Sequence, residues 1–219
     1  MARTKSSSQW LQRHVKDPYV RRARSDGYRS RAAFKLIEVN TRDRLLIPGA
    51  NVVDLGGAPG GWSQVAAEKV GPAGRVIAVD LLEIAPISHV TVLRGDFRAA
   101  EVQARVAAAL QGRKADVVLS DLSPNISGIA SADQARAAEL VRTAMDFCRQ
   151  QLQPEGAFLV KVFQGEEFAG LLKEMKGMFS SVRTLKPAAS REDSRETYLL
   201  ARGLKGYNGQ QLRNEGASP

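Results

Sequence analysis

Short apolar runs alternate with amphipathic stretches along most of the chain. The runs are bounded by Gly, Pro or polar residues, which predicts strands at 51–55, 75–80, 90–94, 115–120, 156–163, 181–185 and 196–202. Two longer stretches, 132–152 and 167–179, place apolar residues at helical spacing. Cys148 belongs to the apolar stripe of the first, and we interpret both stripes as faces that pack into a core.

The repeated β-then-α order predicts an α/β fold with a mostly parallel, seven-stranded sheet and helices on both faces. At 219 residues, with 43% hydrophobic side chains, the chain is long enough for one such core and short for two. We therefore expect a basic N-terminal arm at 1–30, one domain at 31–204 and a flexible C-terminal tail at 205–219. Ligands of such sheets bind at the carboxyl ends of the strands, so function should lie there.

Positive charge is concentrated in the arm. Residues 1–35 contain ten Lys or Arg against two Asp, a net +8 of the +9 carried by the whole chain. This asymmetry favours binding to a nucleic acid, and Trp10, Tyr19 and Tyr28 between the cations suit stacking on bases. The alternative is a solvated basic tail whose aromatic side chains dock on the core.

Composition also limits the classes of protein to which the chain can belong. The one cysteine, Cys148, allows no intrachain disulfide, and the two histidines form no cluster with metal-ligand spacing, so we expect no metal. No apolar run is long enough to span a bilayer and the N-terminus has no apolar signal core, so we expect a cytoplasmic protein. An Arg- and Ser-rich organelle transit peptide stays an alternative for the N-terminus.

A glycine-rich loop follows the first predicted strand, in VVDLGGAPGGWSQ at 52–64. Glycines at such a turn let the backbone approach a ligand where a Cβ would collide. Acids recur where strands end: Asp54, Asp80, Asp96 and Asp121. Asp80 lies 20 residues beyond Gly60, the spacing at which an acid of a nucleotide-binding βαβ unit takes ribose hydroxyls. These features predict a ligand that contains a ribose.

The loop excludes several nucleotides. A Walker loop needs Gly-Lys-Ser/Thr, whereas Trp62 follows the last glycine here. Ala58 replaces the middle glycine of a dinucleotide loop, and Pro59 lacks a backbone donor for a pyrophosphate. S-adenosylmethionine has an adenosine but no phosphate, and carboxylates suit its sulfonium and amino groups, so it fits best.

Six segments, in this order and spacing, carry a family resemblance: VVDLGGAPGGWSQ, VIAVDLL, GDFR, SDLSPNISG, VKVFQG and SRETYL. Over residues 7–204 the chain resembles the FtsJ-like ribose 2′-O-methyltransferases, and closely those that methylate a uridine of 23S (large-subunit) ribosomal RNA. The resemblance implies a Rossmann-like S-adenosylmethionine-dependent methyltransferase fold. It also implies cofactor contacts by Gly60, Trp62, Asp80, Asp96 and Asp121.

The same resemblance implies a catalytic Lys–Asp–Lys–Glu tetrad: Lys35, Asp121, Lys161 and Glu196. Taken alone, Lys35 could be a surface lysine and Glu196 could be half of a surface ion pair. Trp62 of the loop could likewise be packing. Lys161 is different because it interrupts FLVKVF, where a strand covered on both faces should be apolar. Sequence leaves open whether Lys161 is a general base or an orienting cation.

We therefore expect an RNA ribose 2′-O-methyltransferase that acts as a monomer on ribosomal RNA, within the large subunit, with S-adenosyl-L-methionine as cofactor and the arm on the RNA. Transfer RNA and messenger caps are alternative substrates. An NAD-dependent oxidoreductase would explain the loop and Asp80 but not the arm or Lys161. A non-catalytic RNA-binding protein would explain the arm but not Lys161.

Overall fold

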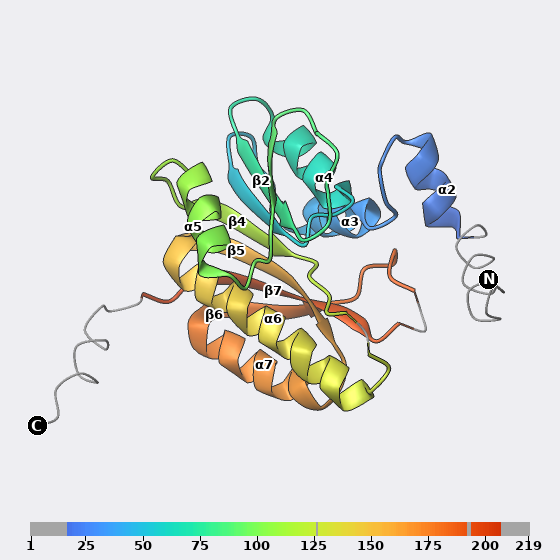
Figure 1. The fold of residues 1–219 in the computed structure, drawn as a ribbon, viewed down its shortest axis with the longest axis vertical. Coiled ribbons are helices and arrows are strands. Elements are labelled where there is room, and N and C mark those ends of the chain that lie inside the picture. The colour runs from blue at the N-terminus through green and yellow to red at the C-terminus, as the bar shows by residue number, and fades with distance from the viewer. Residues whose placement is uncertain (1–16, 126, 192–193, 207–219) are drawn as a thin grey trace, which may run out of the picture.

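The computed structural model describes residues 17–125, 127–191 and 194–206. In these residues one seven-stranded sheet has the order β3-β2-β1-β4-β5-β7-β6 (Figure 1). The strands are β1 (Asn51–Leu55), β2 (Arg75–Asp80), β3 (Val90–Arg94), β4 (Ala115–Ser120), β5 (Leu152–Phe163), β6 (Phe179–Leu185) and β7 (Glu196–Leu204). β7 runs antiparallel to β5 and β6, and the other pairs are parallel.

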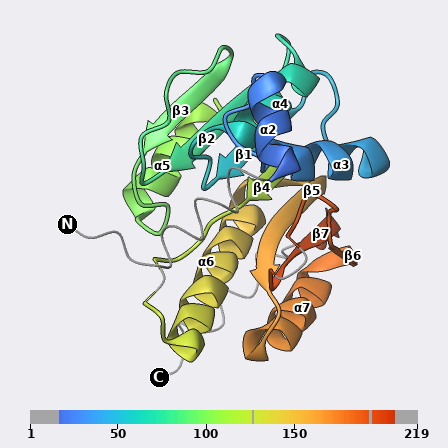
Figure 2. The same ribbon diagram turned by 90° about the vertical axis from the view of Figure 1, so that its right-hand side faces the viewer.

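Helices cover both faces of the sheet (Figures 1 and 2). α3 (Ala33–Asp43) and α4 (Gly61–Val70) contribute Leu36 and Val65 to one apolar core. On the other face, α5 (Ala100–Ala109), α6 (Ala130–Gln151) and α7 (Glu166–Met178) contribute Val106, Met145 and Met175. The predicted mostly parallel α/β sheet is therefore confirmed.

The largest difference from the predicted elements lies at the start of β5. The strand begins at Leu152, not at 156, and α6 ends one residue earlier than predicted. Leu152 pairs with Ala115 of β4, after which the register shifts so that Val117 pairs with Ala157. Leu152 is buried in the core from this strand position. Its apolar side chain fitted the helical stripe equally well, so periodicity alone could not place the boundary.

Part of the predicted arm packs on the domain. α2 (Pro18–Ser25) begins after Asp17, whose carboxylate accepts the Tyr19 amide hydrogen bond at 3.0 Å. The Tyr19 and Tyr28 rings lie 5.7 and 5.8 Å from the Phe34 ring, between centroids. The structure thus favours the docked alternative for these two tyrosines. Trp10, with the rest of residues 1–16, lies outside the described residues, as does all of the predicted tail at 205–219 except residues 205 and 206.

None of the helices in the described ranges is long and apolar enough to cross a membrane.

Candidate active site

A cavity of about 730 Å³ opens at the carboxyl ends of the central strands. Its size is typical of a small-molecule site. Gly56 of the glycine loop lines it together with one acid from each of three strand ends, Asp80, Asp96 and Asp121. Lys161 of β5 adds a cationic side chain to the same wall. The sheet topology therefore brings these residues, distant in sequence, to one place.

The glycine loop passes close to the backbone that follows β4. Gly56 has φ +79°, and a Cβ placed on it would lie 2.9 Å from the Leu122 nitrogen. Asp80 fixes the loop, because its carboxylate accepts hydrogen bonds from the amides of Ala58 at 3.0 Å and Leu82 at 2.8 Å. The cavity wall at this loop is thus close-passing backbone beside the fixed carboxylate of Asp80. Such a wall fits a nucleoside with hydroxyl and amino donors better than a polyphosphate.

Asp96 is held by a neighbour that sequence reasoning did not single out. Nε of Arg98 donates to both Asp96 carboxylate oxygens, at 3.0 and 3.1 Å, and Nη2 donates to Oδ2 at 2.6 Å. The Arg98 side-chain hydrogen bond is the main reason why the pKa of Asp96 lies below its ordinary value. Asp96 therefore faces the cavity as an ionised acceptor.

Gly60 and Trp62 are placed differently from the three acids. Neither is among the described residues that line the cavity. Trp62 is only 3% exposed, and its indole Nε1 donates to the Ala32 carbonyl at 2.8 Å. Its ring lies 5.8 Å from that of Tyr198. The side chain of Trp62 packs between the loop and the core, so any cofactor contact by these two residues stays a prediction.

Lys161 is a buried lysine with polar partners at the cavity. Its side chain is 5% exposed, and its Nζ lies 3.1 Å from Asp121 Oδ1. Nζ also donates to the Asp121 carbonyl at 2.9 Å and to the Ser123 hydroxyl at 2.5 Å. Burying a charge is costly unless it is paired, and the partners of Lys161 supply that pairing at a cavity wall, where a functional role of Lys161 stays a prediction.

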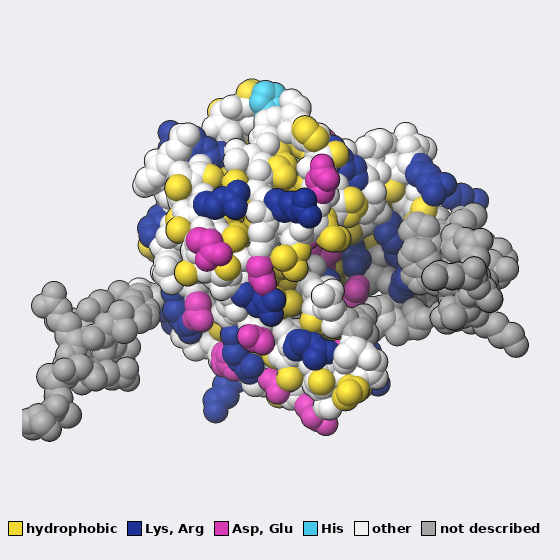
Figure 3. All heavy atoms as spheres, in the orientation of Figure 1, with side chains coloured by type: hydrophobic (Ala, Val, Ile, Leu, Met, Phe, Trp, Pro, Cys, Tyr) yellow, Lys and Arg dark blue, Asp and Glu magenta, His cyan; other side chains and the backbone are white. Residues whose placement is uncertain are grey.

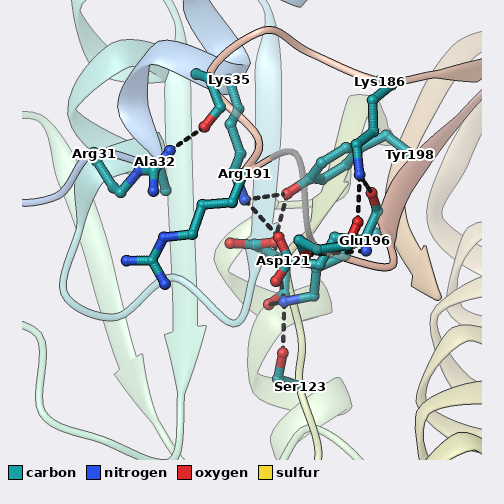
Figure 4. A network of polar contacts seen from close by, with 12 residues as sticks. Arg31, Ala32, Lys35, Asp121, Ser123, Lys186, Arg191, Glu196 and Tyr198 are labelled. Carbon is teal, nitrogen blue, oxygen red and sulfur yellow. Dashed lines mark hydrogen bonds and ion pairs between the residues drawn. The ribbon is translucent and has the colours of Figure 1, made fainter. Parts of the chain in front are cut away.

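Tyr198 joins the two halves of the predicted tetrad (Figure 4). Lys35 Nζ contacts Glu196 Oε2 and the Tyr198 hydroxyl, each at 3.0 Å. The Tyr198 hydroxyl in turn donates to Asp121 Oδ1 at 3.2 Å. Lys35 is therefore a buried network member and not a free surface lysine. The structure places all four predicted residue types in one connected cluster, although their catalytic roles stay predictions.

The protonation states in this cluster follow from burial and charge. Burial pushes the pKa of Glu196 upward, but the charge and hydrogen bond of Lys35, helped by Lys161 and Lys186, hold the pKa below its ordinary value. Burial, with the nearby charges of Asp121 and Glu196, raises the pKa of Tyr198 well above its ordinary value. Tyr198 therefore acts as a neutral hydroxyl that both accepts and donates hydrogen bonds.

Two members of the cluster, Tyr198 and Ser123, were not predicted. A signal for Tyr198 was present, because side chains two apart on a strand share a face and Tyr198 follows Glu196 at that spacing. The β5–β7 register also sets Tyr198 opposite Lys161. Ser123 follows β4 in a loop, where spacing does not determine side-chain direction.

Asp54 lies beneath the glycine loop and is fully buried. Its Oδ2 accepts a hydrogen bond from the Ser63 hydroxyl at 2.6 Å, and its Oδ1 has no hydrogen-bond partner among the described residues. Burial raises the pKa of Asp54 to about 7, against the Ser63 hydrogen bond, and the charges of Asp121 and Asp80 add to the rise.

We expect Asp54→Asn to stabilise the protein more at pH 8 than at pH 5. A carboxyl group whose pKa is raised by folding contributes stability at low pH that is lost as pH rises to the folded value, here about 7. The amide can accept the same Ser63 hydrogen bond and does not ionise. Urea unfolding of parent and variant at both pH values measures this. An equal change in the free energy of unfolding at the two pH values would contradict a raised pKa.

The sheet with its antiparallel β7 and the cavity at the strand ends define the Rossmann-like class of S-adenosylmethionine-dependent methyltransferases. The crystal structure of Aeropyrum pernix fibrillarin with bound S-adenosyl-L-methionine shares the fold, with a TM-score of 0.55 and 19% identity, over 80% of this chain and 75% of that one. The model of the FtsJ-like methyltransferase family matches residues 28–204. The chain belongs to this family and is a methyltransferase.

Close relatives span nearly the whole chain. "Ribosomal RNA large subunit methyltransferase E" of Chromohalobacter salexigens is 54% identical over 203 residues, 93% of this chain and 97% of its own. The protein of the same name from Pseudomonas aeruginosa is 50% identical over 206 residues, 94% of this chain and 100% of its own. A Plasmodium falciparum crystal structure, described as a ribosomal RNA methyltransferase, has a TM-score of 0.72 and 30% identity, over 82% of this chain and 100% of that one.

Proposed function

We propose that this methyltransferase transfers the methyl group of S-adenosylmethionine to the ribose 2′-hydroxyl of a uridine in 23S (large-subunit) ribosomal RNA. The observation that carries the proposal is the buried Lys161 paired with Asp121 at the wall of the cavity. The relatives of 50–54% identity, whose names specify ribosomal RNA of the large subunit, support the substrate.

The cavity lining fits the cofactor. We infer that Asp80 accepts hydrogen bonds from the ribose hydroxyls and Asp96 from the adenine amino group, because each is a carboxylate that lines the cavity at the end of a neighbouring strand. Gly56 leaves room for the close passage of the ligand along the loop. When bound, S-adenosylmethionine supplies a methyl group on a positively charged sulfur, which the carboxylate of Asp121 favours electrostatically.

The chain's own residues then position and deprotonate the ribose hydroxyl. Lys161 lies at the cavity wall, where it takes the proton of the attacking hydroxyl or, as the ammonium ion, stabilises the negative charge that develops on the oxygen while its proton passes to water. Asp121 and Ser123 hold Lys161 in place. Lys35, oriented by Glu196 and Tyr198, lies on the side toward the N-terminal segment and holds the RNA. Most of the rate gain comes from alignment of the reacting atoms.

Basic side chains support contact with RNA on the same side. α2 exposes Arg21 and Arg24, and basic side chains are visible on that end of the molecule in Figure 3, whereas acidic and basic side chains intermingle over the body. On the other side of the cluster, Lys186 and Arg195 are exposed near Glu196. We infer that RNA phosphates contact basic side chains on both sides of the cluster. The arm supplies those on one side. The cytoplasmic location and monomeric state stay predictions.

Transfer of labelled methyl groups to different RNAs tests the substrate. We expect label to enter large ribosomal subunits that lack the modification, and to enter transfer RNA or capped messenger RNA at no more than background. Free 23S RNA in the same assay shows whether the assembled particle is needed. Efficient labelling of transfer RNA, with none in subunits or 23S RNA, would contradict the proposed substrate.

A further inference from the structure

The guanidinium of Arg29, in the predicted arm, donates hydrogen bonds to backbone carbonyls. Nη1 donates to the carbonyls of Pro59 at 3.2 Å and Ala85 at 2.6 Å, and Nη2 donates to the carbonyl of Pro86 at 2.7 Å. Pro59 belongs to the glycine loop, and the other two belong to the loop between β2 and β3. One side chain thus ties two loops that are separate in sequence.

The residues around Arg29 fit closely against the glycine loop and the first turn of α4. A Cβ on Gly60 would lie 2.7 Å from Ile87 and 3.0 Å from Nη1 of Arg29, and one on Gly61 would lie 2.3 Å from the Ser30 hydroxyl. The Arg29 amide also donates to the Gln64 side chain at 2.8 Å. The segment at 27–32 therefore braces the loop from outside the cavity, because none of its residues is among the described residues that line it.

The two braced loops flank the cavity. Ala58 lines it immediately before Pro59, and Leu81 and Leu82 line it at the start of the β2–β3 loop. Asp80 bonds the amides of Ala58 and Leu82 from inside, while Arg29 bonds carbonyls of the same two loops from outside. The relative position of the loops is thus fixed from both sides.

We propose that Arg29 is a positioning residue for the cofactor site, and that its charge serves the two loops rather than an RNA phosphate. The role of Arg29 rests on the proposed function at one point, namely that the cavity binds S-adenosylmethionine. A guanidinium has five donors in a fixed planar fork, which suits several carbonyls at once. The three carbonyls take three of these five donors, two on Nη1 and one on Nη2, so only Nε–H and one Nη2–H are left for any other partner. Arg21 and Arg24, exposed on α2, are left for the RNA.

The test measures binding of S-adenosylhomocysteine by calorimetry, without RNA, to Arg29→Met. Because the loss of charge-assisted hydrogen bonds frees two cavity loops, we expect the Kd to rise about tenfold or more. Arg75→Met is the matched control, since Arg75 also donates to a carbonyl, that of Leu110 at 2.9 Å, but at the opposite end of β2. We expect its Kd for S-adenosylhomocysteine to match that of the parent.

RNA kinetics separate the two possible roles of Arg29. We expect Arg24→Met to raise the KM for RNA. We expect Arg29→Met to raise the Kd for S-adenosylhomocysteine instead. An Arg29→Met protein that binds S-adenosylhomocysteine like the parent but has a raised KM for RNA would overturn the proposal. If Arg29→Met does not fold, Arg29→Lys carries the test, because one ammonium cannot bond all three carbonyls and the Kd should still rise.

A different result would contradict the proposed function itself, namely a parent protein that binds S-adenosylhomocysteine but methylates no RNA.

Discussion

Lys161→Met is expected to lower the rate of methyl transfer by about 10²–10⁴-fold at saturating S-adenosylmethionine and RNA. Methionine fills similar space but can neither accept a proton nor carry a charge, and this range is typical of a positioned acid or base. Binding of S-adenosylhomocysteine should change little, because the loss lies in the transition state. Initial rates and calorimetry on the same preparation measure both quantities.

Lys173→Met is the control for this change, since Lys173 is an exposed lysine of α7 and should be dispensable. Lys161→Arg distinguishes the two roles of the side chain. A pH–rate profile like that of the parent would show that Lys161 stabilises charge and is not the base. A Lys161→Met rate within a few-fold of the parent would contradict both roles.

Asp121→Asn is expected to lower kcat/KM for methyl transfer by about 10²–10³-fold, a loss typical of one preorganised electrostatic contact. Asp121 pairs with Lys161 and accepts from the Tyr198 hydroxyl while it lines the cavity. The amide keeps the shape but loses the negative charge. We therefore expect both weaker binding of S-adenosylhomocysteine and a lower kcat, in contrast to Lys161→Met.

Asp146→Asn provides the control for this second change, because Asp146 is exposed on α6 and paired with Arg149. Thermal unfolding of Asp121→Asn checks that the loss does not arise from misfolding. Unchanged kcat and unchanged binding of S-adenosylhomocysteine in a folded Asp121→Asn protein would show that the carboxylate is not part of the site.

The sequence was most informative where apolar runs were short and bounded by turn residues. The bounds of β1, β2, β3 and β4 are those predicted, because each strand is a compact run that ends at a polar residue or, for β1, directly before a glycine. The start of β5 was predicted wrongly, because Leu152 fits a helical stripe as well as a strand. Only its pairing with Ala115, a contact distant in sequence, decides between them.

The acids of the site were predictable because parallel strands place their carboxyl ends at one edge, which brings Asp80, Asp96 and Asp121 together. The side-chain contacts around the site were not predictable from the sequence. Arg98 folds back on Asp96 through side-chain torsions that no spacing rule gives. Arg29, counted in the sequence as part of a basic arm, instead bonds carbonyls 30 to 57 residues away. Charge patterns indicate a partner for the segment but not for each side chain.

The central claim is that the Lys161 cluster methylates a ribose hydroxyl, and alkaline hydrolysis of labelled RNA tests it most directly. A methylated 2′-hydroxyl cannot attack the neighbouring phosphate, so its linkage survives alkali. With large subunits that lack the modification, we predict label in an alkali-resistant dinucleotide with the parent protein and none with Lys161→Met. Label recovered only in mononucleotides would show methylation of a base and would contradict this account.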